Sequence, residues 1–175
     1  MNTRQRLVYV ITAGAFLLAA QPTSLLAALG GSPANSNLQV QANVQTLCTV
    51  STTPVNFGSY DSTSATDTDQ NGTVTIQCTR GTVATIDLQN GNNFSGGTRR
   101  MASQTVAPTE FLTYGLFTDA PGGTPWGAAI AGGTTVGYTA LSSNPTNITV
   151  FGRLNALQDV SADSYLDDVL VEATF

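Results

Sequence analysis

The clearest hydrophobic pattern in the chain is a strict alternation within residues 35–50 (NSNLQVQANVQTLCTV). Leu38, Val40, Ala42 and Val44 are apolar, and Gln or Asn fills each position between them. A period of two is typical of a β-strand with one face buried and the other in water. The pattern therefore predicts a strand near the start of the folded part of the protein.

A matching alternation closes the sequence. Val169, Val171, Ala173 and Phe175 share one side of this last segment. A final strand at the border of a sheet leaves one row of backbone donors and acceptors without partners. The two segments together predict one strand that is free to pair elsewhere and one sheet edge that lacks a neighbour.

Five further apolar or alternating runs lie between these segments, at residues 54–60, 73–78, 84–88, 111–118 and 148–154. The connections are rich in Gly, Asn and Pro; residues 61–70 are predicted to be a loop, and Asn71-Gly72 to be a tight turn. No run after the leader repeats at the helical period. The pattern predicts an all-β sandwich, because a closed barrel would not leave an edge at Phe175.

The first 28 residues have the features of a secretory signal peptide. Arg4 and Arg6 precede an apolar run over residues 7–20 that is too short to span a bilayer comfortably, and small residues favour cleavage at Ala27 or Ala28. The alternative is an uncleaved membrane anchor. Cleavage would leave a linker and N-terminal strand at residues 29–46 and a domain at residues 47–175.

Secretion determines how the two cysteines are interpreted. In an oxidising compartment an isolated pair such as Cys48 and Cys78 is expected to form a structural disulfide. Closing the loop between them should stabilise the fold by roughly 3–4 kcal/mol. Two cysteines without any His make no ordinary zinc site.

The charge of the mature chain excludes two classes of partner. Of 6 cationic residues, 2 lie in the leader, so 4 cations face 11 carboxylates and the mature net charge is −7. Such an acidic surface argues against binding to nucleic acid or anionic lipid, and no membrane insertion of the mature chain is expected.

The missing residue types exclude most catalytic chemistry. Without His and Lys, the chain has no Ser-His-Asp triad, no Schiff-base lysine and no Walker-type phosphate site. Asp67, Asp69, Asn71 and Gly72 imitate the first half of a calcium loop, but Cys78 stands where a bidentate Glu is needed. We therefore predict no enzyme activity, metal or cofactor, with a hydrolase using an Asp pair in the polar turn at residues 159–163 as the remaining alternative.

Two aromatic or basic features have a structural and a functional interpretation. Arg99 and Arg100 are expected to pair with the protein's own carboxylates, the alternative being a recognition patch. Trp126, the only Trp, is expected in the core, although a sugar could stack on it if its long loop left it exposed.

Short motifs follow one another in a fixed order from about Leu38 to Phe175. They are Leu47-Cys48-Thr49-Val50, Phe57-Gly58-Ser59-Tyr60, Gly72-Thr73-Val74 with Cys78-Thr79, Arg100-Met101, Tyr114-Gly115-Leu116-Phe117-Thr118-Asp119, Trp126-Gly127, and Tyr165 and Asp167 before the last strand. This ordered set resembles the spore coat protein U domain family, the subunits of archaic chaperone–usher pili of the Csu type. Where that family often has Gly two residues before the Tyr, this chain has Asp163.

The resemblance implies an incomplete immunoglobulin-like sandwich that lacks its last strand and is completed by a donor strand from a neighbouring subunit. The donor side chains would be Leu38, Val40, Ala42 and Val44. One wall of the acceptor groove would be formed by Val169, Val171, Ala173 and Phe175.

The same resemblance implies a function, a location and partners. The expected protein is a pilus subunit for surface adhesion and biofilm formation, secreted through the periplasm to the cell surface. Its expected partners are a periplasmic chaperone, an outer-membrane usher and neighbouring subunits. A single domain favours a shaft or adaptor subunit over a two-domain tip adhesin.

Three alternatives stay open at this point. Residues 38–50 could pair within their own sheet. The protein could instead be a monomeric secreted sandwich that binds carbohydrate or another surface ligand through Trp126, or a structural protein of a spore coat.

Overall fold

The computed structural model describes residues 33–175, which divide into a short segment, 33–41, and the unit Ala42–Phe175. Nine strands lie in the second unit, and the described residues contain no helix long and apolar enough to cross a membrane. The predicted signal peptide, residues 1–28, lies outside the described residues.

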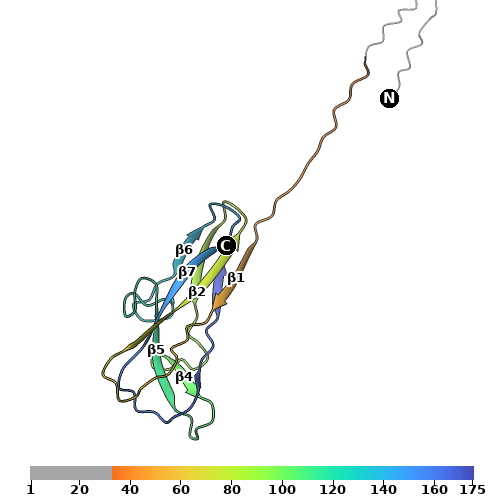
Figure 1. Cartoon of the computed structure of the whole chain (residues 1–175). Coiled ribbons are helices and arrows are strands. Elements are labelled where there is room, and N and C mark those ends of the chain that lie inside the picture. Colours follow the sequence, from red (N-terminus) through yellow and green to blue (C-terminus); the bar gives the residue numbers. More distant parts are fainter. Residues whose placement is uncertain (1–32) are drawn as a thin grey trace, which may run out of the picture. The chain divides into compact units, whose positions relative to one another are not determined.

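The larger of two sheets has six strands in the order β1-β2-β7-β5-β4-β8, and all neighbours are antiparallel. Its strands are β1 (Cys48–Thr53), β2 (Thr68–Cys78), β7 (Thr146–Leu154), β5 (Phe111–Phe117), β4 (Arg99–Ser103) and β8 (Tyr165–Leu166) (Figure 1).

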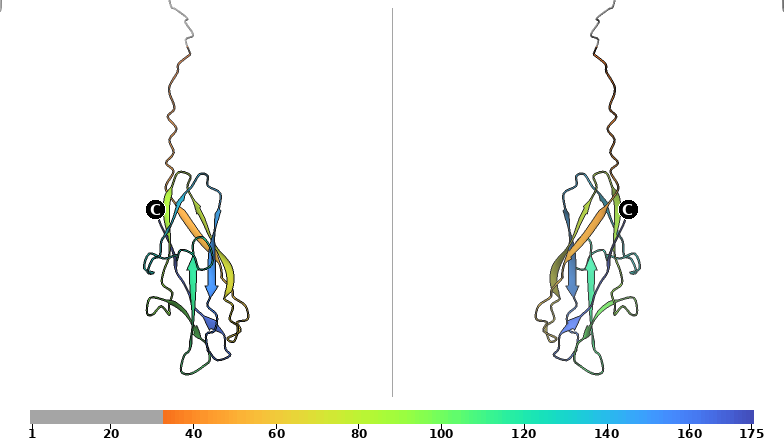
Figure 2. Two further views of the ribbon diagram at one scale, coloured as in Figure 1. Left: turned by 90° about the vertical axis from the view of Figure 1, so that its left-hand side faces the viewer. Right: turned by 90° about the vertical axis from the view of Figure 1, so that its right-hand side faces the viewer.

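The smaller sheet has three antiparallel strands in the order β6-β3-β9. They are β6 (Val136–Thr139), β3 (Val83–Leu88) and β9 (Val171–Thr174). Most strands lie roughly along the long axis of the unit when it is viewed from its sides, and β1, in orange, crosses that axis obliquely (Figure 2).

Alternate residues of both sheets form one buried core. The predicted alternation is confirmed for the runs at 73–78, 84–88, 111–118 and 148–154. The buried side chains are Val74, Ile76 and Cys78; Ala84, Ile86 and Leu88; Leu112, Tyr114 and Leu116; Val150 and Leu154; and Trp126 and Ala140. Two sheets that share a core in this way form a β-sandwich, so the predicted fold class is confirmed.

The predicted turn at Asn71-Gly72 is wrong, because both residues lie inside β2. There they pair with Phe151 and Val150 of β7, so the long-range ladder overrides the local turn preference. A Cβ atom on Gly72 would come within 2.8 Å of the Thr53 carbonyl oxygen, which explains why glycine stands in this strand.

Other strand predictions need correction as well. Residues 54–60 form no strand; they follow the end of β1 as an irregular segment. The sequence predicts one closing strand over residues 169–175, but residues from Tyr165 onward form two strands, β8 and β9, which belong to different sheets. Alternation could not reveal this switch, because it reports which side is buried and not which strand is the partner.

The disulfide between Cys48 and Cys78 is confirmed. The two residues stand directly opposite each other in the register of β1 and β2. The bond therefore fixes the first strand of the unit to the adjacent strand, at the point where the N-terminal segment joins the sandwich.

The predicted pairing of Arg99 with carboxylates is wrong. Its side chain is 3% exposed, and its Nη2 donates to the carbonyl oxygens of Leu88, Gln89 and Trp126 at 2.7, 2.8 and 2.9 Å. Burial lowers the pKa of the Arg99 guanidinium. Because Arg99 belongs to the large sheet and Leu88 ends a strand of the small one, the guanidinium ties the two sheets together.

Trp126 lies in the core, as predicted. Its side chain is 0% exposed, and its indole Nε1 donates to the Ile86 carbonyl oxygen at 3.1 Å. The long connection between β5 and β6 is therefore anchored to the small sheet at this residue.

Replacing Arg99 by Met should lower the free energy of unfolding by about 3 kcal/mol, because several buried carbonyl groups lose a charged donor. Urea unfolding of the full mature chain, followed by the fluorescence of its single Trp, measures this loss. Arg100→Met is the matched control, since Arg100 donates to the Asn93 carbonyl and lies over the Phe111 ring at 4.1 Å. We expect the control to cost less than about 1 kcal/mol; equal losses would contradict the assigned role of Arg99.

Candidate functional site

An open groove of about 920 Å³ runs between two segments of the sandwich, residues 52–60 and 160–171. Its floor consists of core side chains from both sheets, namely Val74, Leu88, Met101, Leu112, Tyr114, Leu116, Val150 and Leu154. Since these side chains form the hydrophobic core, the groove is a place where the core itself is accessible from outside.

The groove is bordered by two edge strands. Within residues 33–175, β1 pairs only with β2, and β9 pairs only with β3. The Gln89 amide donates to the Leu170 carbonyl oxygen, so the antiparallel alternation directs the main-chain groups of Val171 and Ala173 away from β3. The groove therefore combines an apolar floor with a free row of backbone donors and acceptors.

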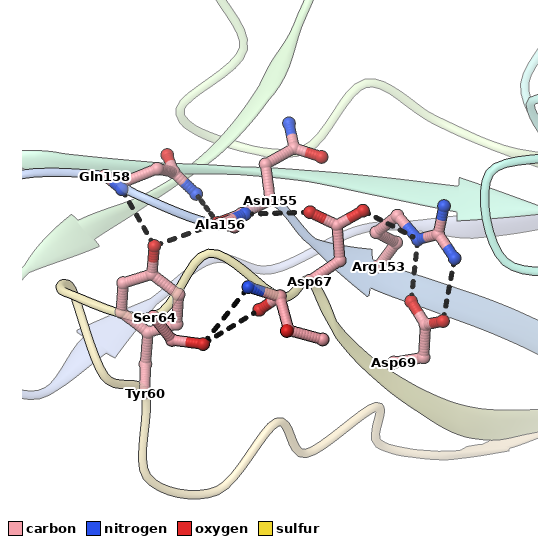
Figure 3. A network of polar contacts seen from close by, with 9 residues as sticks. Tyr60, Ser64, Asp67, Asp69, Arg153, Asn155, Ala156 and Gln158 are labelled. Carbon is pink, nitrogen blue, oxygen red and sulfur yellow. Dashed lines mark hydrogen bonds and ion pairs between the residues drawn. The ribbon is translucent and has the colours of Figure 1, made fainter.

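The wall at residues 54–60 is positioned by Tyr60. Its hydroxyl group donates to the Asn155 carbonyl oxygen and accepts from the Gln158 amide, both at 2.9 Å (Figure 3). A Cβ atom on Gly152 would come within 2.5 Å of a Val55 methyl group. Glycine in β7 thus lets this wall lie directly on the large sheet.

The opposite wall is held by two aspartates. Asp167 accepts from the Tyr114 hydroxyl at 2.6 Å and from the Asn93 amide at 3.1 Å. Burial, with the bond to Asp167 as a second cause, raises the pKa of Tyr114, so the phenol stays protonated as a donor.

Asp163 fixes the start of the same wall. Its carboxylate accepts from the backbone amides of Thr105 and Val106 at 2.7 and 3.0 Å and from the Thr105 hydroxyl at 2.9 Å. These bonds to the ionised form lower the pKa of Asp163. An aspartate thus secures this turn with hydrogen bonds.

The predicted donor side chains lie outside any strand. Leu38, Val40 and Val44 are 88%, 85% and 80% exposed, and Ala42 is exposed as well. Only residues from Cys48 onward pair within the unit's own sheet, as β1. The alternative in which the whole stretch 38–50 joins its own sheet is therefore wrong for residues 38–47.

The predicted wall residues fall into two groups. Val169 and Val171 line the groove. Ala173 packs partly buried against the core, while Phe175 is more than half exposed, and neither lines the groove. Four further residues line the groove and were not predicted as its walls, namely Val55, Phe57, Val160 and Tyr165. The only signal for them in the sequence is the alternation of Val55 and Phe57, which predicts a strand.

Several chemical alternatives lose their support in this geometry. Trp126 is too deeply buried to stack on a sugar. Asp69, one of the residues that imitate a calcium loop, forms a bidentate ion pair with Arg153 at 2.7 and 2.8 Å. Its carboxylate is therefore already paired with a cation of the protein. No group of three or more His, Cys, Asp or Glu in the described part of the chain is placed to hold a metal ion.

A family model decides what this sandwich is related to. The model described as the spore coat protein U domain matches residues 34–172. The chain belongs to the spore coat protein U domain family. The match spans the exposed N-terminal segment, β1, both groove walls and the first two residues of β9.

One solved structure supports the fold of this spore coat protein U domain. It is a complex of the CsuC chaperone with the CsuE tip adhesion subunit from the archaic chaperone–usher Csu pili of Acinetobacter baumannii. The TM-score is 0.54 at 20% identity, and the match covers 75% of this chain but only 40% of that chain. No curated protein sequence matches at a significant level.

The hydrogen bonds of Asp163 in the groove wall should make the stability of the fold depend on pH. Because the folded-state pKa lies well below the ordinary carboxyl value of about 4, the contribution of Asp163 to stability is complete above about pH 4 and is lost progressively as the pH falls from there toward the lowered folded-state pKa. Asp163→Asn should lower the urea midpoint at pH 7 and should lower it by clearly less at pH 2. Asp159→Asn, an exposed neighbour in the same loop, serves as control and should change neither midpoint; a pH-independent loss in Asp163→Asn would refute this role.

Proposed function

We propose that this chain is a structural, non-enzymatic subunit of an archaic chaperone–usher pilus, and that it polymerises by donor-strand exchange. The observation that carries the proposal is the coexistence of an open, strand-shaped groove and an exposed alternating segment in one chain. We name residues 35–46 the donor arm. Fibres built in this way would serve surface adhesion and biofilm formation at the cell surface.

The donor arm and the groove are chemically complementary. The groove offers apolar side chains below and free backbone groups on both borders, and the arm offers apolar side chains at every second position. Full burial of Leu38, Val40 and Val44 would contribute about 1.5–3 kcal/mol each, and each added backbone bond about 0.5–1.5 kcal/mol. Strand addition to an open edge uses these same two sources of affinity.

The directions of the border strands determine how subunits would join. β1 and β9 run in opposite directions, since β1 is antiparallel to β2, the tight β2–β3 connection reverses the chain, and β9 is antiparallel to β3. If an arm inserts parallel to β1, its C-terminal end lies at the end of the groove toward which β1 runs. The sandwich to which the arm belongs then lies beyond that end of the groove. The opposite insertion would place both neighbours at the same end of one subunit, where they would collide.

This head-to-tail contact does not close on itself and would therefore build a fibre. Before assembly, the exposed core needs a temporary cover, and the chaperone–subunit complex of the Csu system supports a periplasmic chaperone in that role. An outer-membrane usher would then exchange the chaperone strand for the donor arm of the next subunit.

Val40→Asp in the full mature chain should abolish fibres and leave monomers, because a carboxylate would be buried in the apolar groove. Gln41→Asp is the matched control: it adds the same charge on the other side of the arm, which would face water, and should still assemble. Sedimentation velocity after refolding measures both. Polymers of normal length from Val40→Asp would contradict the proposal.

A mixing experiment tests the groove separately. Val169→Asp should be unable to accept an arm, while Leu170→Asp, on the exposed side of the same segment, should behave as wild type. Val40→Asp and Val169→Asp should each stay monomeric alone and form only heterodimers when mixed, because each supplies the half that the other lacks. If the mixture stays monomeric although both variants are folded by Trp fluorescence, donor-strand exchange is refuted.

A further inference from the structure

Two opposite ends of the sandwich differ sharply in charge. We call the first the arm end; it comprises residues 45–48, 79–83 and 140–145, joined by the bonds from the Gly81 amide to the Ala140 carbonyl oxygen at 2.8 Å and from the Thr79 hydroxyl to the Gln45 carbonyl oxygen at 2.9 Å. These segments contain no Asp or Glu and one cation, Arg80.

The second end, the loop end, comprises residues 61–67, 104–110 and 155–164. It is rich in carboxylates, namely Asp61, Asp67, Glu110, Asp159 and Asp163. Strand β2 separates the two ends by about 35 Å along its length, far more than the roughly 8 Å over which charges interact at physiological salt. Within one subunit the opposite charges therefore do not interact.

Arg80 is the only cation of the described chain that has no interaction partner there. Arg99 is enclosed by carbonyl groups, Arg100 lies over Phe111, and Arg153 is paired with Asp69. Arg80 is exposed, and within residues 33–175 it makes no ion pair. Around it, Val83 and Leu141 expose apolar side chains.

The loop end presents a single apolar residue in an unusual conformation. Leu157 has φ of 55°, the only positive value among the described non-glycine residues, and its side chain is 63% exposed. Its amide donates to the Ser64 carbonyl oxygen, and the flanking Ala156 amide is bound by Asp67 (Figure 3). Leucine rarely adopts this backbone conformation, so a fixed loop that projects it into water indicates a contact function.

We propose that the loop end of one copy docks onto the arm end of the next copy, with Leu157 against Leu141, Val83 and a shallow hollow beside Leu47, and with Asp159 facing Arg80. This proposal rests on the proposed function, because insertion parallel to β1 brings these two ends together. The hollow is lined by Leu47, Thr49, Gln77, Cys78, Thr79 and Ser143. Since Val160 already lines the groove, the docking surface continues directly from the groove's far end.

Hydrogen exchange on assembled full-length mature chains tests the docking, with the monomeric Val40→Asp variant as reference. On assembly, the backbone amides of residues 79–83 and 141–144 should exchange at least about tenfold more slowly than in the monomer. The amides of the groove wall, residues 160–171, should show the same slowing. Arg80→Glu or Leu157→Asn should return the first two segments to monomer rates while the groove wall stays protected. Arg80→Glu combined with Asp159→Arg should restore protection.

The two proposals fail in different ways. A protected groove wall with unprotected 79–83 and 141–144, or unchanged protection in both Arg80→Glu and Leu157→Asn, overturns the docking and leaves donor-strand exchange intact. A groove wall that gains no protection overturns donor-strand exchange itself. Leu157→Asn should keep or raise the melting temperature, because Asn tolerates positive φ, so loss of docking there is not a loss of folding.

Discussion

The constraint on which the structure depends is the exposure of its own core between two sheet edges. β1 borders the large sheet and β9 borders the small one, and the apolar side chains beneath the groove belong to both. Exposed apolar surface is unfavourable in water, and any group that covers this groove would remove the edge backbone groups from water and would have to hydrogen-bond them. A strand placed between the two edges would meet both requirements, because it covers the apolar floor and pairs with open edges.

The rest of the sandwich holds this groove open. Arg99 joins the sheets through carbonyl groups, and the disulfide fixes β1 to β2. Tyr60 and Asp167 each hold one wall by hydrogen bonds to sequence-distant partners. Both walls are therefore held in place by the subunit's own contacts, and a preorganised site loses less entropy on binding.

Charge adds a second level of organisation. Three of the four cations in residues 33–175 are committed to internal contacts, and five carboxylates gather at the loop end. A fibre formed only by inserted arms would leave consecutive bodies free to swing on their linkers. A cation and apolar side chains at one end, opposite carboxylates and Leu157 at the other, would limit that freedom without strengthening the strand contact itself.

The sequence by itself determined the all-β class, most of the buried faces, the disulfide and the family. It could do so because alternation records which side of a strand is buried, and because two cysteines in a secreted chain have one obvious partner. Only the tertiary structure decided where strands pair. It placed Asn71-Gly72 inside a strand, divided the last segment between two sheets, and supplied Val55, Phe57 and Val160 as groove walls. It also showed that Arg99 binds backbone carbonyl groups. Every residue has such a group, so the sequence does not indicate which of them bind the guanidinium. Strand partners and backbone acceptors come from residues far apart along the chain, and a local pattern holds no record of them.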